Sequence, residues 1–196
     1  MSKNRIVVVI GNPGVKSRTK VLAQAIASRL VDGLAGHLAV EVQTVEIAQL
    51  APHLLASGWP AELPPEGVAA VRAIETADLV IAATPVYKGS YTGLFKHLFD
   101  LVGPDALVGR PVLLAANGGS DRHALVVDHQ LRPLFSFFRA LSVPSAVYAA
   151  ESDFDGYTIV NSGLKARIAE AAGQAVDLLV QASAQREASL LQRQAA

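Results

Sequence analysis

The residues best suited to chemistry are 84–91, with the sequence Thr-Pro-Val-Tyr-Lys-Gly-Ser-Tyr. They directly follow an apolar segment. Residues 78–83 before them are mostly small or β-branched, as in a buried strand, and Pro85 fixes φ and has no amide hydrogen. We therefore expect an irregular turn whose remaining N–H groups face a planar ring, with Pro85, Val86, Tyr87 and Lys88 as contacts. Open α/β sheets bind ligands at this carboxyl edge. An ordinary strand-to-helix turn is the alternative interpretation.

A second candidate site follows the first apolar run, in residues 11–20, Gly-Asn-Pro-Gly-Val-Lys-Ser-Arg-Thr-Lys. Free amides at a helix start, together with the positive end of the helix dipole, favour a bound phosphate. Ser17 and Thr19 are candidate hydroxyl donors, and Arg18 is a candidate charged donor. The spacings of a Walker A motif and of Gly-x-Gly-x-x-Gly are absent, so a phosphomonoester suits the loop better than a dinucleotide. Ser17 or Thr19 also suits a simple helix N-cap.

A third polar segment follows the next apolar run, at Asn117, Gly118 and Gly119. Paired glycines let the backbone approach a flat ring closely, and Ser120 or Asp121 can cap the following helix. Because Asp121 would repel a phosphate, we place the anion at the first loop and the ring between the second and third loops. One site for a single phosphate and a separate site for one flat ring suit a mononucleotide such as FMN.

The composition of the chain argues against several classes of protein. The chain has 196 residues, 51% of them hydrophobic, which is enough for one substantial core. Seventeen basic residues balance 17 acidic ones, so binding to nucleic acid is not expected. The chain has no cysteine, and its five histidines form no i, i+4 pair, so we expect no metal site. Neither a signal segment nor an apolar run of about 18 residues is evident, so we expect a cytoplasmic protein without membrane contact.

Short apolar runs alternate with segments of helical period, which indicates βαβ units around a parallel sheet. We predict an α/β, flavodoxin-like three-layer sandwich whose five-stranded parallel sheet has the order 2-1-3-4-5. Residues 1–184 are expected to form a single domain, and residues 185–196 a helix end or flexible tail. The strands are predicted at 5–10, 40–45, 79–83, 111–116 and 145–149. The helices are predicted at 19–34, 66–77, 92–102, 122–141 and 164–184.

Two segments depart from this regularity. Residues 50–65 contain four prolines and the single tryptophan, so we predict a long ordered loop, either a surface covering or an oligomer contact. Pro133 lies inside the helix predicted at 122–141, so a kink or bulge near His129 is expected. His129 is then either an interface residue near the bound ring or a plain surface histidine. Apolar stripes on the helices at 92–102 and 122–141 favour oligomerisation.

Together the three loops resemble the NAD(P)H-dependent FMN reductase family, in particular the small flavin reductases of alkanesulfonate and methanesulfonate monooxygenases. Ser17-Arg18-Thr19 is similar to the phosphate loop of that family, residues 84–88 to its ring platform, and residues 118–128 to its third loop and following helix. In the alkanesulfonate-linked branch an aromatic residue in a one-residue helical bulge matches His129. The histidine makes this chain more similar to the methanesulfonate branch.

The resemblance implies an enzyme that transfers a hydride from NADH or NADPH to FMN and supplies reduced FMN to a two-component, sulfonate-type monooxygenase. It also implies a homodimer or homotetramer. The flavin and nicotinamide carry the chemistry, so no catalytic side chain is expected. Two alternatives remain open: a quinone or azo reductase with bound FMN, and a flavodoxin-type electron carrier. Such carriers are usually strongly acidic, whereas this chain is neutral.

Overall fold

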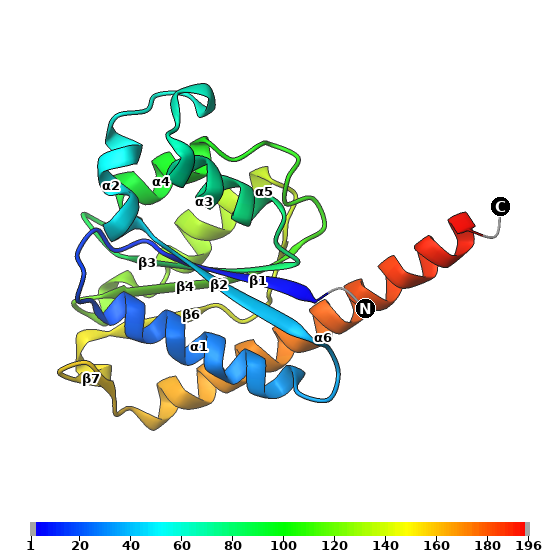
Figure 1. The fold of residues 1–196 in the computed structure, drawn as a ribbon. Helices are drawn as coiled ribbons and strands as arrows, with labels where there is room; N and C mark the ends of the chain where they lie inside the picture. Colours follow the sequence, from blue (N-terminus) through cyan, green and yellow to red (C-terminus); the bar gives the residue numbers. More distant parts are fainter. Residues whose placement is uncertain (1–2, 195–196) are drawn as a thin grey trace.

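A parallel β-sheet forms the middle layer of the computed structural model, which describes residues 3–194 (Figure 1). Along the sheet the order is β2-β1-β3-β4-β5, and β6 also pairs with β4. Every strand pair within this sheet is parallel, as predicted. The strands are β1 (Asn4–Ile10), β2 (Val40–Glu46), β3 (Leu79–Pro85), β4 (Pro111–Gly118), β5 (Leu141–Ser142) and β6 (Val147–Ala150).

Two helical layers cover the sheet, one on each face (Figure 1). Alternate residues of β1 divide between two apolar cores: Val7 and Val9 face one side, and Ile6 and Val8 face the other. Because apolar cores cover both faces of the sheet, the sequences of β1 and β3 are nearly continuously apolar. On one side lie α1 (Arg18–Leu34) and α6 (Ser162–Gln194), and on the other α2 (Ile47–Leu55), α3 (Pro65–Glu75), α4 (Gly93–Asp100) and α5 (Arg132–Phe137).

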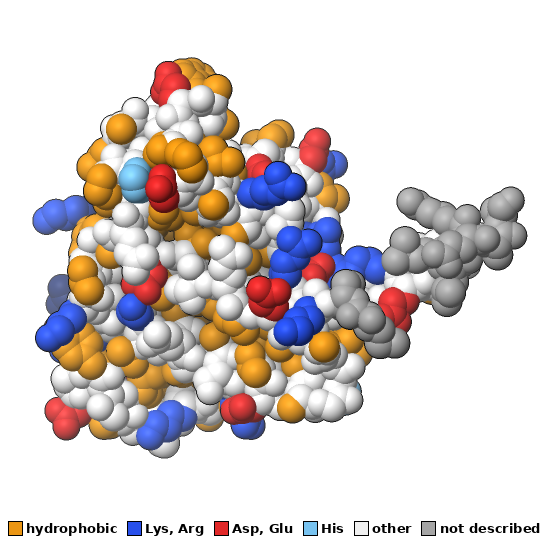
Figure 2. Space-filling model, in the orientation of Figure 1, with side chains coloured by type: hydrophobic (Ala, Val, Ile, Leu, Met, Phe, Trp, Pro, Cys, Tyr) orange, Lys and Arg blue, Asp and Glu red, His pale blue; other side chains and the backbone are white. Residues whose placement is uncertain are grey.

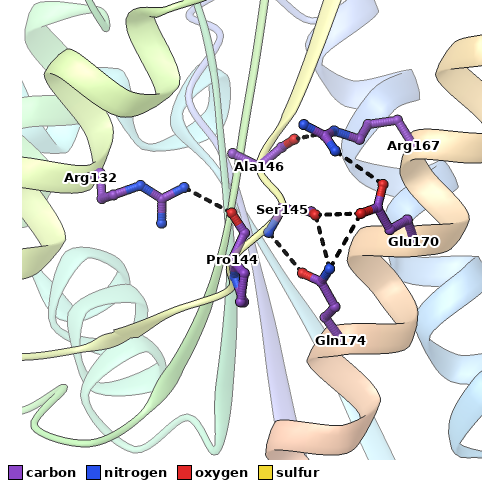
Figure 3. A network of polar contacts seen from close by, with 7 residues as sticks. All are labelled: Arg132, Pro144, Ser145, Ala146, Arg167, Glu170 and Gln174. Carbon is purple, nitrogen blue, oxygen red and sulfur yellow. Dashed lines mark hydrogen bonds and ion pairs between the residues drawn. The ribbon is translucent and has the colours of Figure 1, made fainter.

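The fifth position of the sheet differs from the prediction of one strand, because two short strands, β5 and β6, share it. The link between them, residues 143–146, has no ladder partners in β4 and is held by side chains from both helical layers (Figure 3). Arg132 donates to the carbonyl oxygens of Val143 and Pro144, at 3.3 and 3.2 Å. The backbone N–H of Ser145 donates to Gln174 Oε1 of α6 at 2.8 Å. Side-chain acceptors and donors therefore replace the missing pairing with β4.

The prediction of a loop over residues 50–65 was wrong at its start, where α2 forms with Pro52 inside it. Pro52 costs the helix about 3 kcal/mol. Ile47, Leu50 and Leu54 on its inner face are buried, and each such side chain contributes about 1.5–3 kcal/mol. Burial therefore outweighs the proline. Figure 2 shows hydrophobic side chains gathered over the α2–α3 segment, where Leu55 and Trp59 are exposed.

The prediction of one helix over residues 122–141 was also wrong. The segment is divided into a 3₁₀ turn at Asp121–His123, a π-helix at Val127–Leu131 and the short α5. Pro133 is the second residue of α5, where its missing amide is tolerated. The π-helix therefore lies directly before the proline and contains His129, at the place where the sequence predicts a bulge.

The long helix α6 continues through the segment predicted as a helix end or tail and extends past the sheet (Figure 1). One group of its polar contacts surrounds the buried Ser145 (Figure 3), and another joins Arg186 to Asp78 and Asn4. Glu170 Oε1 accepts from Ser145 Oγ at 2.9 Å, and Glu170 Oε2 accepts from Arg167 Nη1 at 3.0 Å. These bonds fix α6 to the start of β6.

Replacement of Glu170 is expected to give a pH-dependent loss of stability. Hydrogen bonds from Ser145 and then Arg167 lower the pKa of Glu170 below its ordinary value of 4.5. A carboxyl group with a lowered pKa in the folded state stabilises the protein above its unfolded pKa, and this contribution is lost as the pH falls. The difference in unfolding free energy between wild type and Glu170→Gln should therefore shrink below pH 4.5. Urea titrations followed by circular dichroism measure it, with Asp177→Asn on the same helix as control. A difference undiminished at about pH 3 would contradict the assignment.

Candidate functional site

The three polar loops meet at the carboxyl edge of the sheet, after β1, β3 and β4. Thr19 Oγ1 donates to Asn117 Oδ1 at 2.6 Å, which joins the first loop to the third. Val86 N donates to the Asn117 carbonyl oxygen at 2.8 Å, which joins the second loop to the third. Thr92 Oγ1 donates to the Gly11 carbonyl oxygen at 2.9 Å and closes the triangle. Thr19 and Asn117, both predicted from the sequence, are thus in direct contact.

The first loop provides backbone donors at the start of α1. Ser17 is the N-cap, and its Oγ accepts from Lys20 N at 3.0 Å. Among the described residues, the amides of Val15, Lys16 and Arg18 donate to no protein acceptor. Free amides at the positive end of a 17-residue helix can bind a phosphate group. The Ser17 hydroxyl both caps the helix and lies at this position, so the two interpretations of Ser17 are compatible.

The Arg18 side chain contacts the segment that follows β6. Its Nη1 lies 2.7 Å from Glu151 Oε1, and its Nε donates to the Gly156 carbonyl oxygen at 3.1 Å. The guanidinium carbon lies 5.9 Å from the centre of the Phe154 ring. The structure therefore places this charged donor on the segment after β6, and the backbone amides are the donors that the loop itself presents.

The second loop makes a tight turn over Lys88 and Gly89. Both have positive φ, at 52° and 85°, and Tyr87 and Ser90 exchange backbone hydrogen bonds across the turn at 2.9 and 3.2 Å. The amides of Val86 and Tyr87 are therefore occupied, which corrects the expectation that they face a ring. Tyr87 itself is 51% exposed at the rim of the site, next to the buried Pro85. The surface left for a ring is the backbone of the turn and the Tyr87 side chain.

Thr92 fixes the second loop and was not predicted from the sequence as part of the site. Its buried hydroxyl caps α4 by accepting from Phe95 N at 3.2 Å while it donates to Gly11. Thr92 N also donates to Thr84 Oγ1 at 3.4 Å. A threonine directly before an apolar helix is a common N-cap, so the capping role was detectable from the sequence. The bond to the first loop was not, because it joins residues 81 positions apart.

Tyr148 of β6 fixes the third loop and was also missed. Its hydroxyl donates to the Ser120 carbonyl oxygen at 2.6 Å and lies against Gly118, where an added Cβ would be only 2.5 Å away. Burial, then the charges of Asp121 and Asp153, raise the pKa of Tyr148 above 10. Tyr148 therefore remains a neutral donor at physiological pH. Gly119 is exposed, and an added Cβ there would meet nothing within 4 Å, so open space lies in front of its backbone.

His129 is exposed on the π-helix, and its neighbour Gln130 makes the contact with the site. Gln130 Oε1 accepts from Ser90 Oγ at 3.0 Å. The π-helix is thus bonded to the turn that carries Tyr87. A role for His129 near a flavin stays a prediction.

The donor set suits FMN. Free amides at the start of α1 match a phosphate, and the open space at Gly119 admits the edge of a flat ring. Within residues 3–194, no group of three or more His, Asp or Glu side chains could hold a metal ion. None of the helices in the described part of the chain combines the length and apolar character needed to cross a membrane. Figure 2 shows acidic and basic side chains interspersed on the face it displays.

The fold and the three loops define a flavodoxin-like oxidoreductase. An oxidoreductase from Corynebacterium diphtheriae has a similar structure, with a TM-score of 0.81 and 36% identity over 91% of this chain and 98% of that chain. The apo form of an NADH:FMN oxidoreductase has a TM-score of 0.75 and 30% identity, covering 89% of each chain.

A family model described as NADPH-dependent FMN reductase matches residues 4–155, so the chain belongs to this family. The chain is 52% identical to the NADH-dependent FMN reductase SfnF of Pseudomonas fluorescens, over 89% of this chain and 91% of that protein. It is 50% identical to an FMN reductase (NADPH) of Pseudomonas aeruginosa, with the same coverage. The matched region contains all three loops. The family assignment makes the protein an oxidoreductase that uses FMN and a reduced nicotinamide nucleotide.

Proposed function

We propose that the protein reduces FMN with NADH or NADPH and releases reduced FMN for a separate two-component monooxygenase of the sulfonate type. The observation that carries the release step is the openness of the site. Tyr87, Lys88 and Gly119 are all exposed, and no segment among the described residues covers them. A flavin held at the rim by a phosphate loop and one ring face can leave the protein after reduction.

The residues of the chain bind and orient the two substrates in this proposal. The amides of the first loop and the Ser17 hydroxyl hold the phosphate of FMN. Tyr87 and the turn at Lys88–Gly89 contact one face of the ring, and the backbone of Gly118 and Gly119 contacts its edge. Asn117 fixes these loops relative to one another. When bound, FMN supplies the acceptor for a hydride from the nicotinamide. Contact of the two rings in a fixed geometry contributes most of the rate enhancement.

Residues 17–19 and 84–88 resemble the flavin reductases of sulfonate monooxygenases, and the histidine at position 129 makes the methanesulfonate branch the more similar one; these features support a sulfonate-type partner. We propose that this supply takes place in the cytoplasm. A homodimer or homotetramer is proposed from the exposed apolar side chains, including Phe137 and Leu125 near the π-helix.

A steady-state assay of NADH and NADPH oxidation, with and without added FMN, tests the proposal. We expect turnover that depends on added FMN, and protein purified without added flavin that regains activity on its addition. Turnover by a retained flavin, with quinone or azo dye as the preferred acceptor, would contradict the supply role. This alternative is worth measuring because an FMN-dependent NADPH-azoreductase of Staphylococcus aureus is 32% identical over 47% of this chain.

A further inference from the structure

A short β-hairpin presents an aromatic side chain beside the first loop. Its strands are β7 (Phe154–Asp155) and β8 (Thr158–Ile159), and Gly156 has the positive φ, 58°, that a two-residue turn needs. Tyr157 occupies the second position of this turn and is 54% exposed. An exposed tyrosine ring on a tight turn offers a flat apolar face to a ligand.

Arg18 connects the hairpin to the start of α1. Arg18 binds Glu151, the Gly156 carbonyl oxygen and the face of Phe154, as described above. The far end of the hairpin is closed by Asp153, whose carbonyl oxygen accepts from Val160 N at 3.0 Å. The Tyr157 backbone is therefore fixed before any ligand arrives, which lowers the entropy cost of stacking on its ring.

A groove of about 350 Å³ lies between this hairpin and the start of α1. It is lined by Tyr157 of the hairpin, by Lys20 and Gln24 of α1 and by Val15, Lys16 and Ser17 of the first loop. The volume is in the range of small-ligand sites. Ser17 belongs both to this groove and to the proposed phosphate loop, so a ligand in the groove would lie next to bound FMN.

Lys16 provides the uncompensated positive charge of the groove. Lys20 Nζ lies 2.7 and 2.9 Å from the two carboxylate oxygens of Glu46, and Arg18 is paired with Glu151. Lys16 is exposed and forms no ion pair within the described residues. The groove thus combines a stacking face with one free cation, which suits an aromatic base that carries a phosphate.

We propose that this groove binds the adenosine end of NADPH, with the adenine stacked on Tyr157 and the 2′-phosphate bound by Lys16. The inference rests on the proposed function and deepens it, because it places the second substrate and assigns its selectivity. Tyr157 contributes to binding of both nucleotides. Lys16 contributes to NADPH alone, because NADH lacks the 2′-phosphate.

Calorimetric titration of FMN-saturated protein with 2′,5′-ADP and with 5′-AMP tests the site without turnover. We expect 2′,5′-ADP to bind about tenfold more tightly than 5′-AMP, as for one exposed charged contact. Lys16→Ala should remove this difference, and Tyr157→Ala should weaken both ligands about tenfold while Tyr157→Phe preserves both. Arg29→Ala, at the other end of α1, is the control for a lost positive charge and should change neither affinity.

Steady-state kinetics separate this inference from the proposed function. At saturating FMN, Lys16→Ala should raise KM for NADPH about tenfold more than KM for NADH. Displacement of FMN by 2′,5′-ADP, or affinities unaltered in both Lys16→Ala and Tyr157→Ala, would overturn the groove assignment. A wild-type protein that oxidises neither nucleotide in the presence of FMN would instead overturn the proposed function.

Discussion

Gly11→Ala is expected to lower the free energy of unfolding by about 3 kcal/mol. The added Cβ would lie 2.6 Å from Phe95 Cδ2 and 2.9 Å from the Ala83 carbonyl oxygen. Neither neighbour can yield cheaply: Phe95 is fully buried, with its ring centre 4.9 Å from that of Phe99, and the Ala83 oxygen accepts from Gly11 N at 2.7 Å. Urea or thermal unfolding followed by circular dichroism measures the loss.

Gly173→Ala provides the matched control for this experiment. Gly173 lies in α6, and an added Cβ there would meet no atom within 4 Å. This variant should gain about 1 kcal/mol, because alanine favours the helix. Equal stability of the two variants would show that Gly11 is not packed between β3 and α4 as described.

Gly119→Val is expected to lower the affinity for FMN by about two orders of magnitude, or about 2.7 kcal/mol, while the unfolding free energy stays nearly constant. The reason is that open space in front of Gly119 is the place proposed for the flavin ring. A branched side chain would hold the ring away from the backbone and from Tyr87. Quenching of flavin fluorescence on titration with protein measures the affinity.

Gly119→Ala should give an intermediate loss of FMN affinity, and Gly173→Val should give none. A graded series would show that the size of the side chain at position 119 determines the approach of the ring. Unchanged affinity in Gly119→Val would remove the third loop from the flavin site. The family assignment would be unaffected by that result.

Much of the fold was predictable because local patterns and the sheet agree. The buried strands β1, β3 and β4 have continuous apolar runs, and α1 begins at an N-cap serine. The strand order followed from the alternation of strands and helices. In α2, the burial of apolar side chains competes with the preference of Pro52 against a helix. The prolines of this segment indicated a loop, and that prediction was wrong where α2 forms. The division of the fifth strand depends on side-chain contacts of Arg132 and Gln174, which adjacent residues do not indicate.

The positions of the three loops of the candidate site were predictable from the sequence, but the long-range hydrogen bonds that connect them were not. Ser17, Thr19 and Asn117 lie where the sequence placed them, because each loop directly follows a recognisable strand. The orientation of Arg18 was not predictable, because its partner Glu151 lies 133 residues away. The hydrogen bond that occupies the Tyr87 amide depends on the positive φ of Lys88, a conformation that lysine rarely adopts, and the bond that occupies the Val86 amide joins it to Asn117, 31 positions away.

Asn117 accepts hydrogen bonds from both neighbouring loops, and this has a kinetic consequence. The three loops of the flavin site are hydrogen-bonded to one another before FMN binds. Little ordering of these loops accompanies binding, so the association of FMN with the protein can be fast. The weak retention of FMN that the proposed function requires must then arise from fast dissociation rather than slow association. A protein that supplies reduced FMN to a partner benefits from fast exchange, because each molecule that has released reduced FMN can bind oxidised FMN again at once.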